Sequence, residues 1–293
     1  MVRHGLKIKI HGHDAVRLNF SRLGVYLIMV PLALVMILPL IYAIGSAFKP
    51  LDELLKFPPV FFVRRPTLSN FSDLFLALDS SSLPFLRYLF NSLLVTIAAV
   101  AGAIFVDTLG GYALSKMKIP FKNFFFNLII IAMAFPLAVT AVPNYIIIKW
   151  LSLYDTYWAL ILPLVAGAFG IFLIKQFCDQ LPIALIEAAR IDGATELEIY
   201  FKIVMPFLRP AWATLSVFCF TSTWSNATSA LLYVKNEALR TLPVMLTSIS
   251  ENGNLARVGA TAAASFIMLV PSIVIFMIQQ RKLMDTMAHS GIK

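Results

Sequence analysis

Side chains that could do chemistry are few in this chain. All four histidines are in the two terminal tails: His4, His11, His13 and His289. The two cysteines, Cys178 and Cys219, are too few for a disulfide framework or a metal cluster. No stretch has the G-x-x-x-x-G-K-[ST] pattern that cradles nucleotide phosphates. We therefore expect no catalytic residue, no metal site and no cofactor bound by this chain; any nucleotide would have to bind to another protein.

Asp107 is the only acidic residue near the interior of an apolar segment. Ion-coupled carriers and pumps usually place ionisable groups at membrane depth. The near absence of such groups argues against a proton-coupled carrier and against an intramembrane metalloprotease. We expect Asp107 to lie at a helix end or at the membrane interface rather than to relay protons.

Polar residues gather in one apolar segment, where eight polar or amphipathic side chains fall between positions 221 and 229. Such a stretch would be costly against lipid, so it should face protein or water. Two interpretations stay open: hydrogen bonding between helices, or the wall of a solute pathway. In the second, an aromatic face would stack on a sugar ring and an amide would bind hydroxyl groups. The candidate pathway residues are Thr221, Trp224, Ser225 and Asn226.

Long apolar segments must position these residues. Hydrophobic residues make up 59 % of the 293 and charged residues 13 %, against about 25 % charged residues in soluble domains. A spanning helix needs roughly 20 residues without charge. Six windows meet or approach that length: 23–48, 88–112, 123–148, 156–174, 210–234 and 258–280. The second window reaches it by continuing past its single aspartate. The first window exceeds the ~7–15 apolar residues of a cleaved signal peptide. The sequence thus predicts an all-α membrane protein with six transmembrane helices in one domain, residues 23–280.

The distribution of charge predicts the orientation of the spans. Six spans place both termini on the same side of the membrane. If that side is the cytoplasm, the inner segments carry 15 of the 24 Lys and Arg residues and the outer segments carry 9, in agreement with the positive-inside rule. We therefore expect a cytoplasmic N-terminal arm, residues 1–22, and a cytoplasmic C-terminal tail, residues 281–293. The outer segment 49–87 contains five prolines and is expected to be an ordered loop.

The segment between the fourth and fifth predicted spans, residues 182–206, is helical but not membrane-like. It begins with a proline, which suits a helix start, and Gly193 would end its first helix. Thr195 and Glu198 form a capping-box pattern for a second helix, which is expected to stop before Pro206. The apolar residues of this helix–glycine–helix have no lipid to enter. Two interpretations are open: a hairpin on the membrane surface, or a docking surface for a partner protein.

This segment resembles the signature of ABC importer permeases. The run Glu187-Ala188-Ala189-Arg190-Ile191-Asp192-Gly193-Ala194, followed by Ile203-Val204-Met205-Pro206, is similar to that family's E-A-A…D-G-A…I…P pattern. The resemblance implies a pair of coupling helices seated in a cleft of a cytoplasmic ATPase subunit. It implies contact with the ATPase at Glu187, close approach at Ala188 and Ala189, and a turn at Gly193. The other motif positions are Asp192, Ala194, Ile203 and Pro206.

The resemblance extends over nearly the whole chain. The runs Pro66-Thr67-Leu68-Ser69-Asn70-Phe71 and Arg240-Thr241-Leu242-Pro243-Val244 are similar to outer loops of the sugar permeases. The best match is the oligosaccharide branch, specifically the maltose-type second permease subunit, with the six-span type I permease fold. The C-terminal end loosely resembles a tail that reaches the ATPase, so Ser290 and Gly291 are candidate contacts.

The resemblance implies one half of a heterodimeric channel in the bacterial cytoplasmic membrane. An extracytoplasmic solute-binding protein would deliver an oligosaccharide, and two ATPase subunits would bind ATP and magnesium, so this chain would not be an enzyme. The net charge of +9 is explained by orientation and anionic lipid, and no nucleic acid partner is expected. Two alternatives stay open: a permease of the same fold for a glycerophosphodiester or a uronate oligomer, and, more remotely, a secondary carrier.

Overall fold

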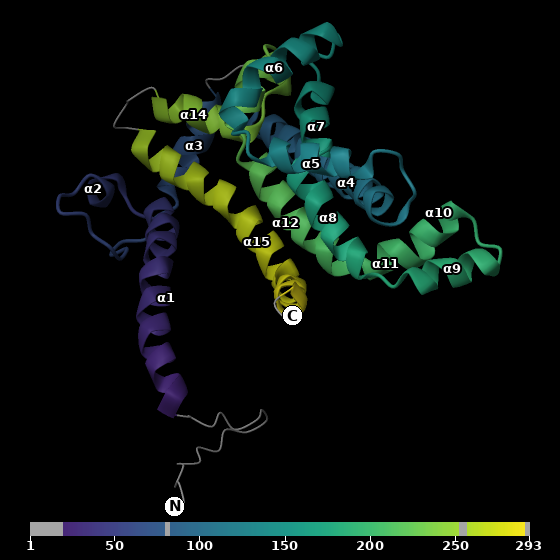
Figure 1. Ribbon diagram of the computed structural model, residues 1–293. Helices are drawn as coiled ribbons and strands as arrows, with labels where there is room; N and C mark the ends of the chain where they lie inside the picture. Colours follow the sequence, from purple (N-terminus) through teal and green to yellow (C-terminus); the bar gives the residue numbers. More distant parts are fainter. Residues whose placement is uncertain (1–19, 80–82, 252–256, 291–293) are drawn as a thin grey trace, which may run out of the picture.

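The computed structural model describes residues 20–79, 83–251 and 257–290 (Figure 1). Every regular element in these ranges is helical, which confirms the predicted all-α class. The N-terminal arm lies almost entirely outside the described residues.

Four stretches are long and apolar enough to cross a membrane: Gly24–Ala47, Phe85–Lys116, Tyr157–Gln180 and Val258–Gln280. They lie in α1 (Phe20–Ala47), in α4 (Phe85–Lys116), across α7 (Tyr157–Val165) and α8 (Ala168–Gln180), and in α15 (Val258–Ser290). A fifth is obtained if two helices that meet at an angle of 75°, Glu196–Phe207 and Arg209–Trp224, are counted as one span. Multiple membrane crossings follow from these helices, whereas the count of six stays a prediction.

The third predicted span is divided into two helices, α5 (Lys122–Met133) and α6 (Leu137–Trp150). Pro136 precedes α6 in an extended conformation, with φ −63° and ψ 144°. Proline has no N–H to continue a helix and disfavours the helical conformation in the residue before it. These helices of 12 and 14 residues are each shorter than a bilayer requires.

The fifth predicted span is divided as well, into α12 (Arg209–Trp224) and α13 (Ala227–Tyr233). Asn226 separates them: its backbone is extended, and its Oδ1 accepts a hydrogen bond from the N–H of Ser229 at 3.0 Å. An asparagine that caps a new helix in this way competes with continuation of the preceding one.

Short helices gather at one end of the bundle (Figure 1). They include α3 (Ser69–Asp79) and α14 (Leu242–Glu251), with η2 (Glu237–Leu239) directly before α14 in the chain, whereas α2 (Leu51–Leu54) lies beside α1. The amide of Asn91 holds this end together. Its Nδ2 donates to the carbonyls of Ala238 at 2.9 Å and Arg240 at 2.8 Å, and its Oδ1 accepts from Tyr157 Oη at 2.7 Å. The predicted outer segment 49–87 therefore includes ordered helical pieces.

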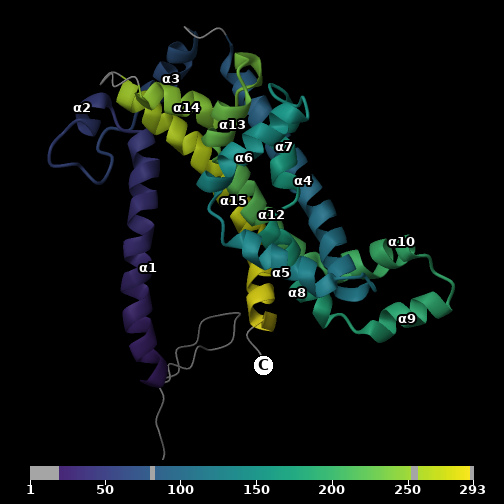
Figure 2. The same ribbon diagram turned by 45° about the horizontal axis from the view of Figure 1, so that its top comes forward.

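Helix α4 is the centre of the bundle and packs against α7, α8 and α12, while α15 packs against α12, α3 and α1. A Cβ on Gly111 of α4 would lie 2.6 Å from Ile174 Cγ2 of α8, so glycine permits this close approach. Helix α1 stands beside the bundle and joins it near its C-terminal end (Figures 1 and 2). None of the residues in its most apolar stretch is buried within the chain.

Candidate functional site

The 182–206 segment forms the helix–glycine–helix that its sequence predicts. Helix α9 (Ile183–Ile191) is followed by Gly193, whose φ is +85°, a value that glycine adopts without the steric cost borne by other residues. The predicted capping box is confirmed at the start of α10 (Glu196–Ile199): Thr195 Oγ1 accepts from the N–H of Glu198 at 3.3 Å, and Glu198 Oε2 accepts from the N–H of Thr195 at 3.0 Å. The Thr195 N–H and the Lys202 ammonium lower the pKa of Glu198 to about 2.

The second helix of the segment does not stop before Pro206, contrary to our prediction. It widens into the π-helix η1 (Tyr200–Val204) and passes into α11 (Met205–Phe207), which contains the proline. The N–H of Met205 bonds to the carbonyl of Tyr200, five residues back. Because Pro206 has no N–H, the regular helical ladder has a gap there, and the wide turn lies directly before that gap.

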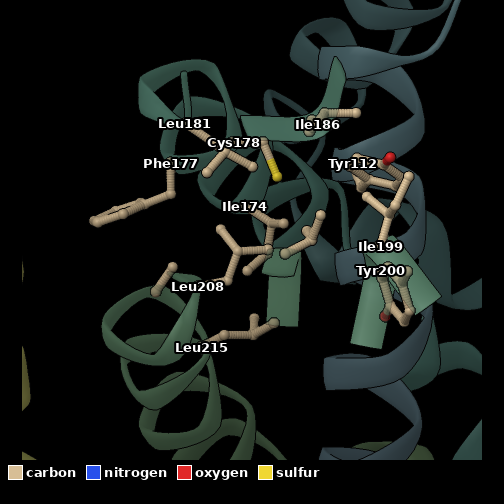
Figure 3. Close-up of a cluster of buried hydrophobic side chains, with 12 residues drawn as sticks. Tyr112, Ile174, Phe177, Cys178, Leu181, Ile186, Ile199, Tyr200, Leu208 and Leu215 are labelled. Atoms are coloured by element: carbon tan, nitrogen blue, oxygen red, sulfur yellow. The ribbon is translucent and has the colours of Figure 1, made fainter. Parts of the chain in front are cut away.

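The inner side of the segment is anchored in a hydrophobic cluster, which we call the inner cluster (Figure 3). Residues of α9 to α11 pack there on the ends of α4 and α8 and on the start of α12. The buried members are Tyr112, Ile174, Phe177, Cys178, Leu181, Ile186, Ile199, Tyr200, Val204, Leu208, Ala211 and Leu215. This packing fixes the segment to α4, α8 and α12.

The outer side of the segment is exposed. Ile191 is 86 % exposed, and Leu185, Leu197 and Phe201 are also solvent-facing. Among the motif positions, five are exposed: Glu187, Ala188, Asp192, Gly193 and Pro206. Ala189, Ala194 and Ile203 are half-buried against the inner cluster. Apolar side chains grouped with acidic ones on an exposed knob are typical of an interaction surface.

Hydrogen bonds join this segment to α4. Tyr200 Oη and Thr108 Oγ1 lie 2.9 Å apart, and Tyr112 Oη donates to Glu196 Oε2 at 3.3 Å. Glu196 also accepts from Arg190 Nε at 2.8 Å, and the Arg190 guanidinium lowers the pKa of the Glu196 carboxyl. No local pattern predicts these contacts, because they pair residues 84 and 92 positions apart.

Asp107, the neighbour of Thr108, is buried inside α4, so the expectation of a helix end is wrong. Its side chain is 1 % exposed, and its Oδ1 accepts from the N–H of Gly167 at 3.2 Å. Gly167 is the residue before α8, and a carboxylate is favourable at a helix N-terminus. A Cβ on Gly170 would lie only 1.8 Å from Asp107 Oδ2. Burial follows because Gly170 leaves room for the carboxylate and the N–H of Gly167 bonds to it.

The candidate pathway residues do not share one environment. Trp224 is 1 % exposed; its ring stacks on Phe220 with centroids 5.7 Å apart, and its Nε1 donates to the carbonyl of Met268 at 2.9 Å. In this arrangement Trp224 is part of the core and bonds to a carbonyl of α15, which favours hydrogen bonding between helices over a pathway wall at this residue. Thr221 and Ser225 are exposed, and Asn226 is half-buried.

Of the two C-terminal candidates, Ser290 ends helix α15, and Gly291 lies outside the described residues.

Comparison with known proteins places this chain in a family. Residues 107–283 match the family described as "Binding-protein-dependent transport system inner membrane component". The chain is 32 % identical to the polygalacturonan/rhamnogalacturonan transport system permease protein YtcP of Bacillus subtilis, over 77 % of this chain and 76 % of that protein. It is 29 % identical to the arabinooligosaccharides transport system permease protein AraQ of Halalkalibacterium halodurans, over 89 % of this chain and 93 % of that protein. It is 34 % identical to the sn-glycerol-3-phosphate transport system permease protein UgpE of Yersinia enterocolitica, over 69 % of this chain and 72 % of that protein.

Two solved structures share the fold. A chain of a bacterial ABC transporter involved in the import of the acidic polysaccharide alginate matches with a TM-score of 0.75 and 23 % identity, over 90 % of this chain and 96 % of that one. A chain of a bacterial alginate ABC transporter in complex with an alginate pentasaccharide-bound periplasmic protein matches with a TM-score of 0.60 and 16 % identity. The match covers 89 % of this chain and 93 % of that one.

The chain belongs to the inner membrane components of binding-protein-dependent transport systems. It is the permease subunit of an ABC importer, a transport component rather than an enzyme, and it is a multi-pass protein of the inner membrane.

Proposed function

We propose that this permease carries an oligosaccharide, as one half of a heterodimeric pathway, and that its 182–206 segment couples the pathway to ATPase subunits. The observation that carries the coupling proposal is that the two sides of the segment differ. Its inner side is buried against α4, α8 and α12, and its outer side is exposed and partly apolar. The cargo proposal is supported by relatives named for oligosaccharide or polysaccharide transport.

The ATPase partner would contact the exposed side of α9 and the turn that follows it. Glu187 offers a charge to a basic residue, and the exposed Ala188 allows close approach. Asp192, Gly193 and Ala194 form the turn, Ala189 and Ile203 pack on the inner cluster, and Pro206 lies in α11. ATP and magnesium would bind to the ATPase and not to this chain. Ser290 and Gly291 are the candidate contacts of the tail.

A second permease subunit would cover part of α1. The side chains of this helix are exposed along its most apolar stretch and meet the bundle only near its C-terminal end. A neighbouring subunit and lipid can share that surface. The outer end of the bundle, with α3 and α14, would receive the solute-binding protein.

We also propose six spans with both termini in the cytoplasm. In Figure 1 the start of α1 and the end of α15 lie toward the side of the 182–206 segment, and α3, α6 and α14 lie toward the opposite side. The short helices α5 and α6 would together make the third span, and α12 with α13 the fifth.

Transport would follow from a two-state equilibrium. ATP binding shifts that equilibrium only through its different affinity for the two arrangements. Closure of the ATPases would push the 182–206 segment, and the inner cluster would pass that movement to α4, α8 and α12. Hydrolysis would restore the first arrangement.

A glycerol phosphate derivative is the second candidate cargo, favoured by the 34 % identity to UgpE. Purification of the tagged chain from its native membrane, followed by mass spectrometry, distinguishes the candidates once the associated binding protein is screened against neutral oligosaccharides, uronate oligomers and glycerophosphodiesters. We expect a second permease, an ATPase and a binding protein that takes an oligosaccharide. A stable preparation without an ATPase, still moving solute along an ion gradient, would contradict the proposed function.

Thiol accessibility tests the pathway residues. In a Cys219→Ala background, Thr221→Cys and Ser225→Cys are expected to react with a water-soluble thiol reagent in at least one nucleotide state. Trp224→Cys is expected to stay unreactive, because its position is buried. Ile28→Cys, exposed on the apolar surface of α1, is the lipid-facing control. The pathway assignment fails if residues 221 and 225 resist the reagent in every nucleotide state.

A further inference from the structure

We propose that the loop of residues 49–66, which follows α1, is an interfacial anchor that inserts into the outer surface of the lipid bilayer. This loop contains α2 and lies on the side of α1 away from the bundle in both views (Figures 1 and 2). The proposal goes beyond the transport function, since it assigns a membrane contact to a segment outside the spanning helices.

The loop folds back along the spanning helix rather than rising above it. The ring of Phe61 lies 5.8 Å from the ring of Tyr42, and Val63 Cγ2 is 3.4 Å from the position of a Cβ on Gly45. Tyr42 and Gly45 belong to the spanning stretch Gly24–Ala47. With a rise of about 1.5 Å per residue, Tyr42 lies ~7 Å before the end of that stretch. Residues 61–63 therefore lie at the depth where the apolar span ends.

Buried charges hold the loop in this position. Lys49 is 1 % exposed; its ammonium donates to the carbonyl of Val60 and lies 4.4 Å from the ring centroid of Tyr42. Glu53 is buried and accepts from the N–H of Arg64 at 3.2 Å. A buried ion is costly unless it is paired or hydrogen-bonded, so these contacts favour one loop conformation. The loop is closed where the N–H of Thr67 bonds to the carbonyl of Phe48 at 2.8 Å.

The surface of this fixed loop suits a lipid interface. Phe57 is 93 % exposed and Phe62 71 % exposed, with Leu55 also outward. Two basic residues, Lys56 and Arg64, are exposed beside them. Aromatic rings with neighbouring cations are the side chains that anchor proteins at the boundary of headgroups and acyl chains.

Lipid is favoured over a docked protein because of where the loop lies. A binding protein that approaches the outer end would meet α3, α6 and α14, which form that end, whereas the loop lies beside α1 (Figures 1 and 2). Its aromatic surface continues the exposed apolar surface of α1. A protein cover on the loop is treated below as an outcome of the test.

Collision accessibility of spin labels tests the proposal. Phe57→Cys and Phe62→Cys are labelled with a nitroxide in the assembled importer, in nanodiscs of phosphatidylethanolamine and phosphatidylglycerol without binding protein. Cys219 is replaced by Ala, and Cys178, which has no exposed surface, is kept. Lys235→Cys, exposed in the loop after α13, is the matched outer-surface control. Normal uptake shows that the variants fold.

We expect greater access of oxygen than of a water-soluble nickel chelate at residues 57 and 62, and the reverse at residue 235. The logarithm of the ratio of oxygen access to nickel-chelate access would thus be positive at the two loop positions and negative at the control. Dominant access of the nickel chelate at both loop positions would overturn the proposal and place the loop in water. Low access of both reagents would also overturn it, because a protein surface would then cover the loop.

Discussion

Gly170→Ala is expected to abolish solute uptake and to lower the thermal stability of the assembled permease. The added Cβ would lie 1.8 Å from Asp107 Oδ2, 2.6 Å from Asp107 Cγ and 3.0 Å from Leu215 Cδ1. The carboxylate is buried and held by the Gly167 N–H, so its displacement would break that hydrogen bond. Overpacking of a core costs about 1–3 kcal/mol, and displacement of a buried hydrogen-bonded carboxylate adds to that cost. Uptake by whole cells and melting in detergent measure the two effects.

Gly167→Ala is the matched control for this prediction. At that position the nearest atoms to a new Cβ are the N of Gly170 at 3.8 Å and Asp107 Oδ2 at 3.9 Å, which is ordinary contact. The control is expected to transport almost normally. Asp107→Ala introduced into the Gly170→Ala chain removes the clashing atoms and should recover part of the lost stability, as a coupled pair requires. Equal uptake by Gly170→Ala and Gly167→Ala would contradict the packing described here.

Gly193→Val is expected to abolish uptake while the protein still inserts into the membrane. Nothing lies within 4 Å of a Cβ at this position, so the substitution acts through the backbone alone. The φ of +85° is strongly disfavoured for a β-branched residue, and a strained backbone of this kind costs of order 1–3 kcal/mol. The turn after α9 would rearrange, and the proposed ATPase contact would be lost. Stimulation of ATPase activity by the loaded binding protein measures the loss.

Gly193→Asn supplies the control, because asparagine tolerates positive φ better than other residues with a side chain. It is expected to retain most of the uptake. If Gly193→Val stimulates the ATPase as well as Gly193→Asn does, the turn has no part in coupling.

A charge reversal on the exposed side of the segment tests its contact with the ATPase without disturbing its fold. Glu187→Lys changes an exposed side chain and is expected to leave thermal stability unchanged while uptake falls at least about tenfold, equivalent to ~1.4 kcal/mol of lost coupling. Lys118→Glu reverses an exposed charge in the loop after α4, outside the 182–206 segment, and serves as its control. Normal uptake by both Glu187→Lys and Gly193→Val would remove the 182–206 segment from the coupling mechanism.

Much of the candidate coupling segment was predictable because its features are local. The capping box needs only Thr195 and Glu198, three positions apart, and the turn needs only a glycine at 193. The helical class also follows from local composition, since long apolar runs in a membrane must satisfy their backbone hydrogen bonds internally. The motif at Glu187–Pro206 likewise identified the family before any contact was known.

The sequence alone therefore determined the class of protein, the family and the helix–glycine–helix, whereas the tertiary structure decided the roles of single polar residues. Asp107 was expected at a helix end or at the membrane interface, and only the approach of Gly167 and Gly170 buries it. Trp224 was open to bonding between helices or to a pathway wall, and only the packing of α12 on α15 places it in the core. The physical reason is that burial depends on neighbours 44 to 60 positions away along the chain, and no local pattern specifies which helix faces will meet.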